Sequence, residues 1–186
     1  MKEDKNRVCP VELAGSLDTK FRRWLQNPNK ILSPHIKEGM RVLDMGCGPG
    51  FFTIEIAKMV GDNGKVFAAD LQEGMLQIVK NKIAGTELEK RITLVKCDKD
   101  KTNVTEKVDF VLCFYMVHEV PGKEDFFKEL KNVLDAGGQI LIIEPAFHVS
   151  KKDFGLTLNI ARSIGLKTNA GPKTFMNRSA ILSLND

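Results

Sequence analysis

The chain has 186 residues, 42% of them apolar and 28% charged, and its formal net charge is +4 at pH 7. This length and composition are typical of one soluble globular domain, predicted to span residues 1–186. No apolar run reaches the roughly 18 residues of a membrane-spanning helix, no secretion signal follows the charged first residues, and the mild basicity is not the dense patch of a nucleic-acid binder. A cytoplasmic protein without a membrane or nucleic-acid partner is therefore expected.

The first 40 residues are expected to form a helical leader in front of the first strand. Asp18 is a candidate N-cap for a short helix that ends at Gln26. Pro28 and Pro34 bracket a second short helix.

Strands and helices then alternate through residues 41–186, the predicted core. The predicted strands are 41–44, 65–69, 91–97, 108–114, 139–143, 166–168 and 178–184, and the predicted helices are 51–60, 72–83, 123–134 and 151–164. This alternation favours an α/β fold in which helices cover both faces of a seven-stranded, mostly parallel sheet. The last two strands are joined by too few residues for a crossover helix, so the C-terminal strand is expected to pair antiparallel. Residues 98–107 hold few apolar side chains, so the helix expected there is short or absent.

A glycine loop lies between the first strand and the helix that follows it. Residues 42–50 read Val-Leu-Asp-Met-Gly-Cys-Gly-Pro-Gly. Such a turn exposes backbone N–H groups to a polar ligand because no Cβ stands in the way. Asp44 repels a phosphate and suits a ligand with a cationic amine and hydroxyl groups.

The glycine spacing argues against two common ligand classes. A dinucleotide loop reads G-x-G-x-x-G, but Phe51 occupies the position of its third glycine. A phosphate loop needs Lys-Ser or Lys-Thr after its last glycine, and neither follows Gly50. The loop instead resembles motif I of the class I S-adenosylmethionine-dependent methyltransferases, near the ubiquinone/menaquinone-biosynthesis-like (methyltransferase type 11) group. A glycine-rich turn without a ligand is the alternative interpretation.

The resemblance implies a Rossmann-like, doubly wound fold, S-adenosylmethionine as cofactor, and in-line transfer of its methyl group to a small-molecule acceptor. The positions that match the cofactor-binding residues of the family are Asp44, Gly46, Cys47, Gly48, Gly50, Asp70, Leu71, Asp98, Lys99 and Phe114. In this assignment Asp70 accepts hydrogen bonds from both ribose hydroxyls, and Leu71 and Asp98 contact the adenine. The alternatives are a helix N-cap for Asp70 and a surface turn for Asp98.

Methyl transfer requires placement and sometimes a base, so no dedicated catalytic motif is needed. Tyr115 lies where the reacting methyl group is expected, and His118 either takes a proton from the acceptor or is a structural histidine. The Asn/Asp-Pro-Pro-aromatic motif of amino-group methyltransferases is absent. Phe21, Trp24 and the Arg22-Arg23 pair form either a small lid or a helix packed on the sheet.

Three other functions remain open at this point. They are a nicotinamide-dependent oxidoreductase, a non-catalytic cofactor-binding module and an RNA methyltransferase. None of the four cysteines forms a C-x-x-C or a Cys/His cluster with zinc spacing, so no metal site is predicted. The sequence does not identify the acceptor or the oligomeric state.

Overall fold

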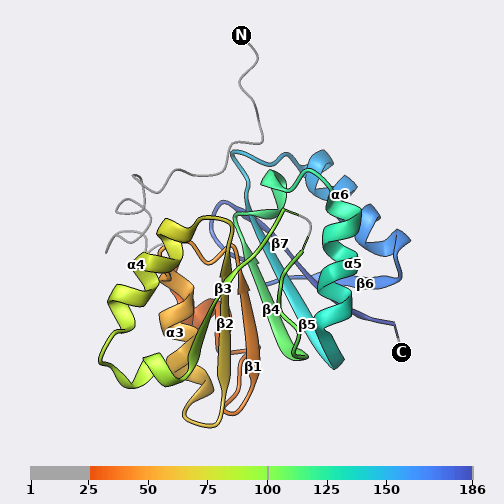
Figure 1. The fold of residues 1–186 in the computed structure, drawn as a ribbon. Helices are drawn as coiled ribbons and strands as arrows, with labels where there is room; N and C mark the ends of the chain where they lie inside the picture. The colour runs from red at the N-terminus through yellow and green to blue at the C-terminus, as the bar shows by residue number, and fades with distance from the viewer. Residues whose placement is uncertain (1–25, 100, 186) are drawn as a thin grey trace.

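A seven-stranded β-sheet organises the computed structural model, which describes residues 26–99 and 101–185 (Figure 1). The strands are β1 (Arg41–Met45), β2 (Lys65–Asp70), β3 (Ile92–Lys96), β4 (Val108–Phe114), β5 (Leu134–Pro145), β6 (Leu166–Ala170) and β7 (Asn177–Leu184). Their spatial order is β3-β2-β1-β4-β5-β7-β6. Strand β7 runs antiparallel to both of its neighbours, which confirms the predicted mixed sheet.

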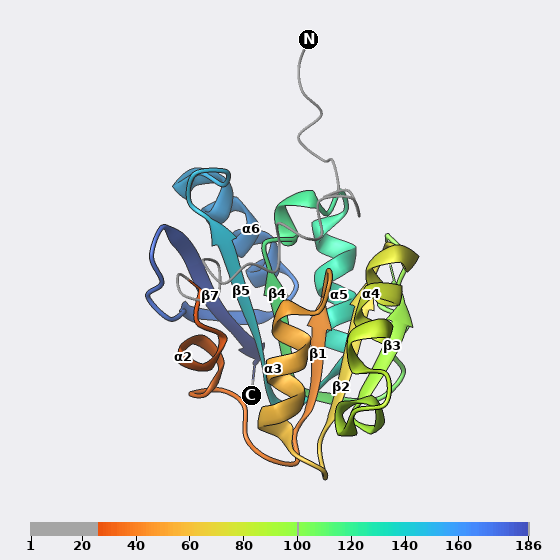
Figure 2. The same ribbon diagram turned by 90° about the vertical axis from the view of Figure 1, so that its left-hand side faces the viewer.

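Helices cover both faces of this sheet (Figures 1 and 2). They are α2 (Pro28–Leu32), α3 (Phe51–Val60), α4 (Glu73–Ile83), α5 (Lys123–Val133) and α6 (Lys151–Ser163), with two short 3-10 helices, η2 (Glu87–Lys90) and η3 (Val117–Glu119). One apolar core joins α2, α3 and α4 to the sheet, and a second core joins α5 and α6 to its other face. Because both faces are covered, the central strands consist mainly of apolar residues.

Strand β4 and helix α5 show how local sequence produces these layers. Every residue of β4 is buried except Asp109, whose carboxylate accepts the backbone N–H of Arg41 at 2.7 Å at the start of β1. In α5, Phe126, Phe127, Leu130 and Val133 recur at helical spacing and are buried, while charged side chains occupy the opposite side.

The predicted elements agree with the structure closely, except at strand β5. Helix α3 and strand β4 have the predicted bounds, whereas β5 begins at Leu134 instead of residue 139. This early start accompanies a register shift between β4 and β5 at Val108 and Phe110. No helix occurs in the described residues between β3 and β4, as predicted. The proposed helix from Asp18 and the lid residues lie outside the described part of the chain, apart from Gln26.

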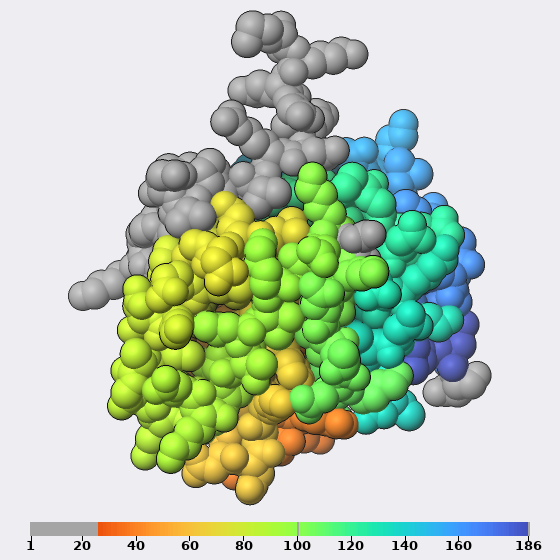
Figure 3. All heavy atoms as spheres, viewed as in Figure 1, coloured from red at the N-terminus to blue at the C-terminus, as the bar shows by residue number. Residues whose placement is uncertain are grey.

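Without a helix between β3 and β4 in the described residues, strand β3 and the segment after it reach the surface (Figure 3). In Figure 3 the green surface between α4 and α5 is formed by β3 and by the segment that leads to β4. Chain order along the sheet reverses between β1 and β4, because the chain builds outward from β1 through β2 to β3 and then returns to β4. Ligands of open α/β sheets bind at the carboxyl ends of the strands at such a reversal.

Candidate active site

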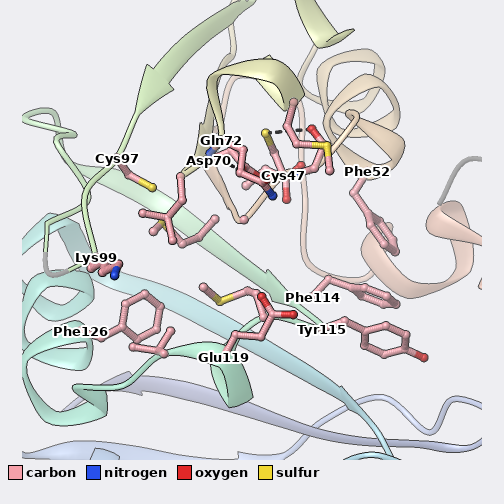
Figure 4. A pocket seen from close by; sticks show the side chains of 18 of the residues that line it. Cys47, Phe52, Asp70, Gln72, Cys97, Lys99, Phe114, Tyr115, Glu119 and Phe126 are labelled. Atoms are coloured by element: carbon pink, nitrogen blue, oxygen red, sulfur yellow. Dashed lines mark hydrogen bonds between the residues drawn. The ribbon is translucent and has the colours of Figure 1, made fainter. Parts of the chain in front are cut away.

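A pocket opens at the carboxyl ends of β1, β2 and β4 (Figure 4). Of the residues that the sequence assigns, it is lined by Asp44, Gly46, Cys47, Gly48, Asp70, Leu71, Asp98, Lys99, Phe114 and Tyr115. The other lining residues are Met45, Pro49, Phe51, Phe52, Gln72, Met75, Cys97, Met116, Glu119, Val120, Pro121 and Phe126. The fold therefore brings most of the predicted positions to one cavity, but Gly50 and His118 are not among its lining residues.

The glycine loop has a backbone shape that only glycine adopts easily. Gly46 and Gly48 have φ angles of +72° and +52°, in the left-handed region. A Cβ at Gly46 would approach Met116 to 3.0 Å, while a Cβ at Gly48 would meet nothing within 4 Å. Gly50 precedes α3, and a Cβ there would approach Val79 of α4 to 3.0 Å. Gly46 and Gly48 thus shape the cavity, whereas Gly50 permits close packing of α3 against α4.

The pair Gly48 and Gly85 provides a controlled test of this loop. Gly85 follows α4, has φ +72°, and a Cβ placed there would likewise meet nothing within 4 Å. Alanine costs about 1–2 kcal/mol of backbone strain at either position. The sequence resemblance implies S-adenosylmethionine as the ligand. We therefore expect Gly48→Ala, which adds a methyl group to the cavity, to weaken binding of the product S-adenosylhomocysteine about tenfold in calorimetry, and Gly85→Ala to leave it unchanged. Equal affinities for the two variants would exclude ligand contact at Gly48.

Asp70 ties the glycine loop to the start of α4. Its Oδ2 accepts the N–H of Gly48 at 2.8 Å, and its Oδ1 accepts the N–H of Gln72, also at 2.8 Å. The side chain is buried, and burial raises its pKa while the two backbone N–H groups lower it. Because each carboxylate oxygen has a second lone pair, Asp70 can hold the backbone and still accept hydrogen bonds from a ligand.

Asp44 places a second carboxylate beneath the loop. It is only 2% exposed, and the hydroxyl of Thr53, in the first turn of α3, donates to its Oδ2 at 2.6 Å. Burial raises the pKa of Asp44 to about 7; the Thr53 hydrogen bond lowers it, and the charge of Asp70 raises it further. Two buried carboxyl groups beside one cavity favour a cationic ligand, which would stabilise their ionised forms.

The end of β3 contributes a polar turn to the same cavity. Asp98 accepts a hydrogen bond from the Asn103 side chain at 3.1 Å, and its own N–H donates to the carbonyl of Lys101. Asp98 is therefore both part of a turn and a lining residue. Cys97, which the sequence did not assign, also lines the cavity; burial and the charge of Asp70 raise its pKa to about 11.

Aromatic rings form one wall of the cavity (Figure 4). Phe114 has its ring centroid 4.3 Å from that of Phe52 and 4.2 Å from that of Tyr115. Tyr115 has a φ of +59°, which is uncommon for a residue with a bulky side chain. Its hydroxyl accepts a hydrogen bond from Gln26 Nε2 at 2.8 Å and donates to Oδ1 of Asn177. Tyr115 thus presents a ring to the cavity, while its hydroxyl connects three separate parts of the chain.

His118 lies behind the cavity and contacts two glutamates. Its Nδ1 is 2.5 Å from Oε2 of the buried Glu144, and its backbone N–H donates to Oε1 of the same carboxylate at 3.1 Å. Its Nε2 is 3.9 Å from Oε1 of Glu119, which does line the cavity. Burial raises the pKa of Glu119, and the charge of His118 lowers it. Glu119 therefore lines the cavity, and His118 lies behind it.

Metal-binding clusters and membrane-spanning helices are both missing from the described part of the chain. Within residues 26–99 and 101–185, no group of three or more His, Cys, Asp or Glu side chains is arranged to hold a metal ion. In the same ranges, no helix is long and apolar enough to cross a membrane.

Comparison with known proteins assigns this chain to a family. The family described as "Methyltransferase domain" matches residues 36–169. A demethylmenaquinone methyltransferase of Bacillus mycoides is 29% identical over 126 residues, which are 67% of this chain and 52% of the relative. One from Lactobacillus johnsonii is 34% identical over 110 residues, 59% of this chain and 45% of the relative. The chain thus spans about half the length of the curated relatives it matches.

Solved structures agree with this match over nearly the whole chain. A SAM-dependent methyltransferase from Aquifex aeolicus has 29% identity and a TM-score of 0.82, and the match covers 94% of this chain and 97% of that one. A chain from Methanococcus maripaludis, with 19% identity and a TM-score of 0.76, shares the fold; the match covers 100% of this chain and 98% of that one.

Proposed function

The chain belongs to the class I S-adenosylmethionine-dependent methyltransferases, in the methyltransferase-domain family, and from this premise we propose that it methylates a small-molecule acceptor. The observation that carries the proposal is the cavity formed by the left-handed glycines 46 and 48 and by the buried carboxyl groups of Asp44 and Asp70. These groups suit a ligand that combines hydroxyls with positive charge.

The residues around the cavity fit this cofactor. Asp70 would bind the ribose hydroxyls, and the backbone of Gly46, Cys47 and Gly48 would hold the methionine end, where Asp44 would balance positive charge. Leu71 would contact the adenine together with Asp98 and Lys99. The raised pKa values of Asp44 and Asp70 support this assignment, because a bound cation offsets the cost of their ionisation.

The aromatic wall supports a flat or apolar acceptor. When bound, S-adenosylmethionine supplies an activated methyl carbon for in-line displacement. Phe114 and Tyr115 position the acceptor and exclude water from the reacting atoms. Because demethylmenaquinone methyltransferases are among the relatives, we propose a hydroxylated aromatic ring of the quinol type as the acceptor.

Two measurements test this function. Calorimetric titration with S-adenosylhomocysteine is expected to show binding, and radiolabelled S-adenosylmethionine with 1,4-naphthoquinol is expected to give a labelled ring product. Absence of heat at roughly millimolar ligand would contradict the cofactor assignment. Binding of S-adenosylhomocysteine without methyl transfer to 1,4-naphthoquinol would support the cofactor assignment and exclude that acceptor.

Glu119 is expected to accept the proton that the acceptor loses as it gains the methyl group. Glu119→Gln should reduce turnover at least roughly tenfold and remove the decline in rate at low pH, because the amide cannot accept the proton. Affinity for S-adenosylhomocysteine should remain unchanged. Glu124→Gln, at an exposed position on α5 that pairs with Lys128, is the matched control. An unaltered pH–rate profile for Glu119→Gln would exclude this role.

A further inference from the structure

Two loops at the carboxyl edge of the sheet expose three large apolar side chains. Phe147, after β5, is 76% exposed, and Phe175 and Met176, before β7, are 69% and 55% exposed. The loops are neighbours, because the N–H of Ala146 donates to the carbonyl of Met176 at 2.8 Å. Figure 2 shows β5 ending and β7 beginning at this edge. We call Phe147, Phe175 and Met176 the loop patch.

This concentration of exposed apolar side chains is unusual within the molecule. Among the described residues, one other large apolar side chain, Leu156 on α6, is similarly exposed, at 53%. Single exposed apolar residues are normal on a protein surface. A cluster on adjacent loop tips instead marks a surface that contacts another phase or molecule.

Basic side chains accompany the loop patch. The segments 145–153 and 171–178 contain four basic residues, Lys151, Lys152, Lys173 and Arg178, and one acidic residue, Asp153. The three lysines are exposed. The carboxylate of Asp153 accepts a hydrogen bond from the hydroxyl of Ser150, and its backbone N–H donates to that same hydroxyl. The segments that contain the loop patch therefore have an excess of positive charge.

We propose that the loop patch binds the surface of an anionic lipid bilayer. Aromatic and methionine side chains on protruding loops insert into the boundary between headgroups and acyl chains, and nearby lysines are attracted to anionic headgroups. The exposed apolar side chains suit the acyl chains of such a bilayer, and the neighbouring lysines suit its anionic headgroups. The contact is peripheral, and it does not depend on the proposed methyltransferase activity.

The loop patch adjoins the aromatic wall of the active-site cavity. Asn177 directly follows Met176, and it accepts the hydrogen bond from the hydroxyl of Tyr115. A bilayer bound at the loop patch therefore lies close to the side of the cavity formed by Tyr115 and Phe114. An apolar acceptor dissolved in the bilayer would have a short path to the cavity.

Sedimentation of the full chain with sucrose-loaded vesicles tests this proposal. We expect binding to phosphatidylcholine vesicles that contain about one third phosphatidylglycerol, weaker binding to phosphatidylcholine alone, and loss of binding as salt rises. Phe147→Ser combined with Phe175→Ser should lower the partition coefficient at least roughly tenfold. Lys152→Gln combined with Lys173→Gln should reduce binding to the anionic vesicles only.

Leu156→Ser is the control, because it removes a similarly exposed apolar side chain outside the two loops. Retained circular dichroism and S-adenosylhomocysteine binding would establish that the serine variant is folded. No binding of the wild type to anionic vesicles, or equal binding by the serine variant, would overturn the proposal. A dimer in sedimentation velocity that the serine variant abolishes, without vesicle binding, would assign the loop patch to a second copy of the chain.

Discussion

Asp70→Ala is expected to weaken S-adenosylhomocysteine binding by at least roughly 100-fold, or about 3 kcal/mol, in calorimetry. The substitution removes both carboxylate oxygens that we propose to bind the ribose hydroxyls, and hydrogen bonds to charged groups contribute about 1.5–3 kcal/mol each. It also frees the N–H of Gly48 from the hydrogen bond that holds the glycine loop against the end of β2. Loss of ligand contact and loss of loop geometry therefore act in the same direction.

Asp125→Ala is a suitable control for this change. Asp125 is an exposed carboxylate on α5 that pairs with Lys128, and it lies outside the cavity. Its replacement changes the net charge by the same amount and should leave the affinity within about twofold. An unchanged affinity of the Asp70→Ala variant would show that Asp70 does not bind the ligand. Its role would then be limited to the hydrogen bond with Gln72 at the start of α4.

Asp44→Asn is expected to change how the stability of the protein depends on pH. Because the pKa of Asp44 in the folded chain is raised from 3.8 to about 7, the folded state holds a proton that the unfolded state has lost. The stabilising contribution is therefore full below about pH 4 and is lost as pH rises to 7, by up to about 4 kcal/mol. Asparagine does not titrate, so the variant should lack this part of the decline.

Urea unfolding between about pH 4.5 and 7.5 measures this difference. Burial also raises the pKa values of Asp70 and Glu119, so both proteins should lose some stability over this range. The difference between the two unfolding free energies reports the titration of Asp44 together with its electrostatic coupling to Asp70, because Glu119 and the remaining groups are common to both proteins. Parallel pH profiles for wild type and Asp44→Asn would show that Asp44 has an ordinary pKa in the folded chain.

Local sequence was sufficient to predict the sheet, its helices and nearly half of the residues that line the cavity. The glycine loop and the acidic residues at strand ends lie on the backbone path itself, so their positions follow once the strands are parallel. Phe126 and Glu119, by contrast, reach the cavity from α5 and η3, and only the packing of those elements determines that they do. Phe51 and Phe52 could have been predicted to line the cavity, because they directly follow the glycine loop in the sequence.

The placement of Glu119 in the cavity wall and of His118 behind it could not be read from the sequence either. Both residues belong to η3, and a histidine is the more usual proton acceptor near neutral pH. The buried carboxylate of Glu144, on the neighbouring strand β5, holds the imidazole behind the cavity. That contact joins positions 26 residues apart, which no local pattern reveals.

The hydroxyl of Tyr115 connects the cavity wall to two segments that lie far from it in the sequence. The hydroxyl bonds both to Gln26, which precedes α2, and to Asn177, at the start of β7. The ring of the same tyrosine stacks on Phe114 in the cavity wall. A ligand that contacts this ring should therefore reduce the local opening of the segments that contain Gln26 and Asn177. Hydrogen–deuterium exchange of their amides should slow when the cavity is filled, and Tyr115→Phe should uncouple that protection from occupancy.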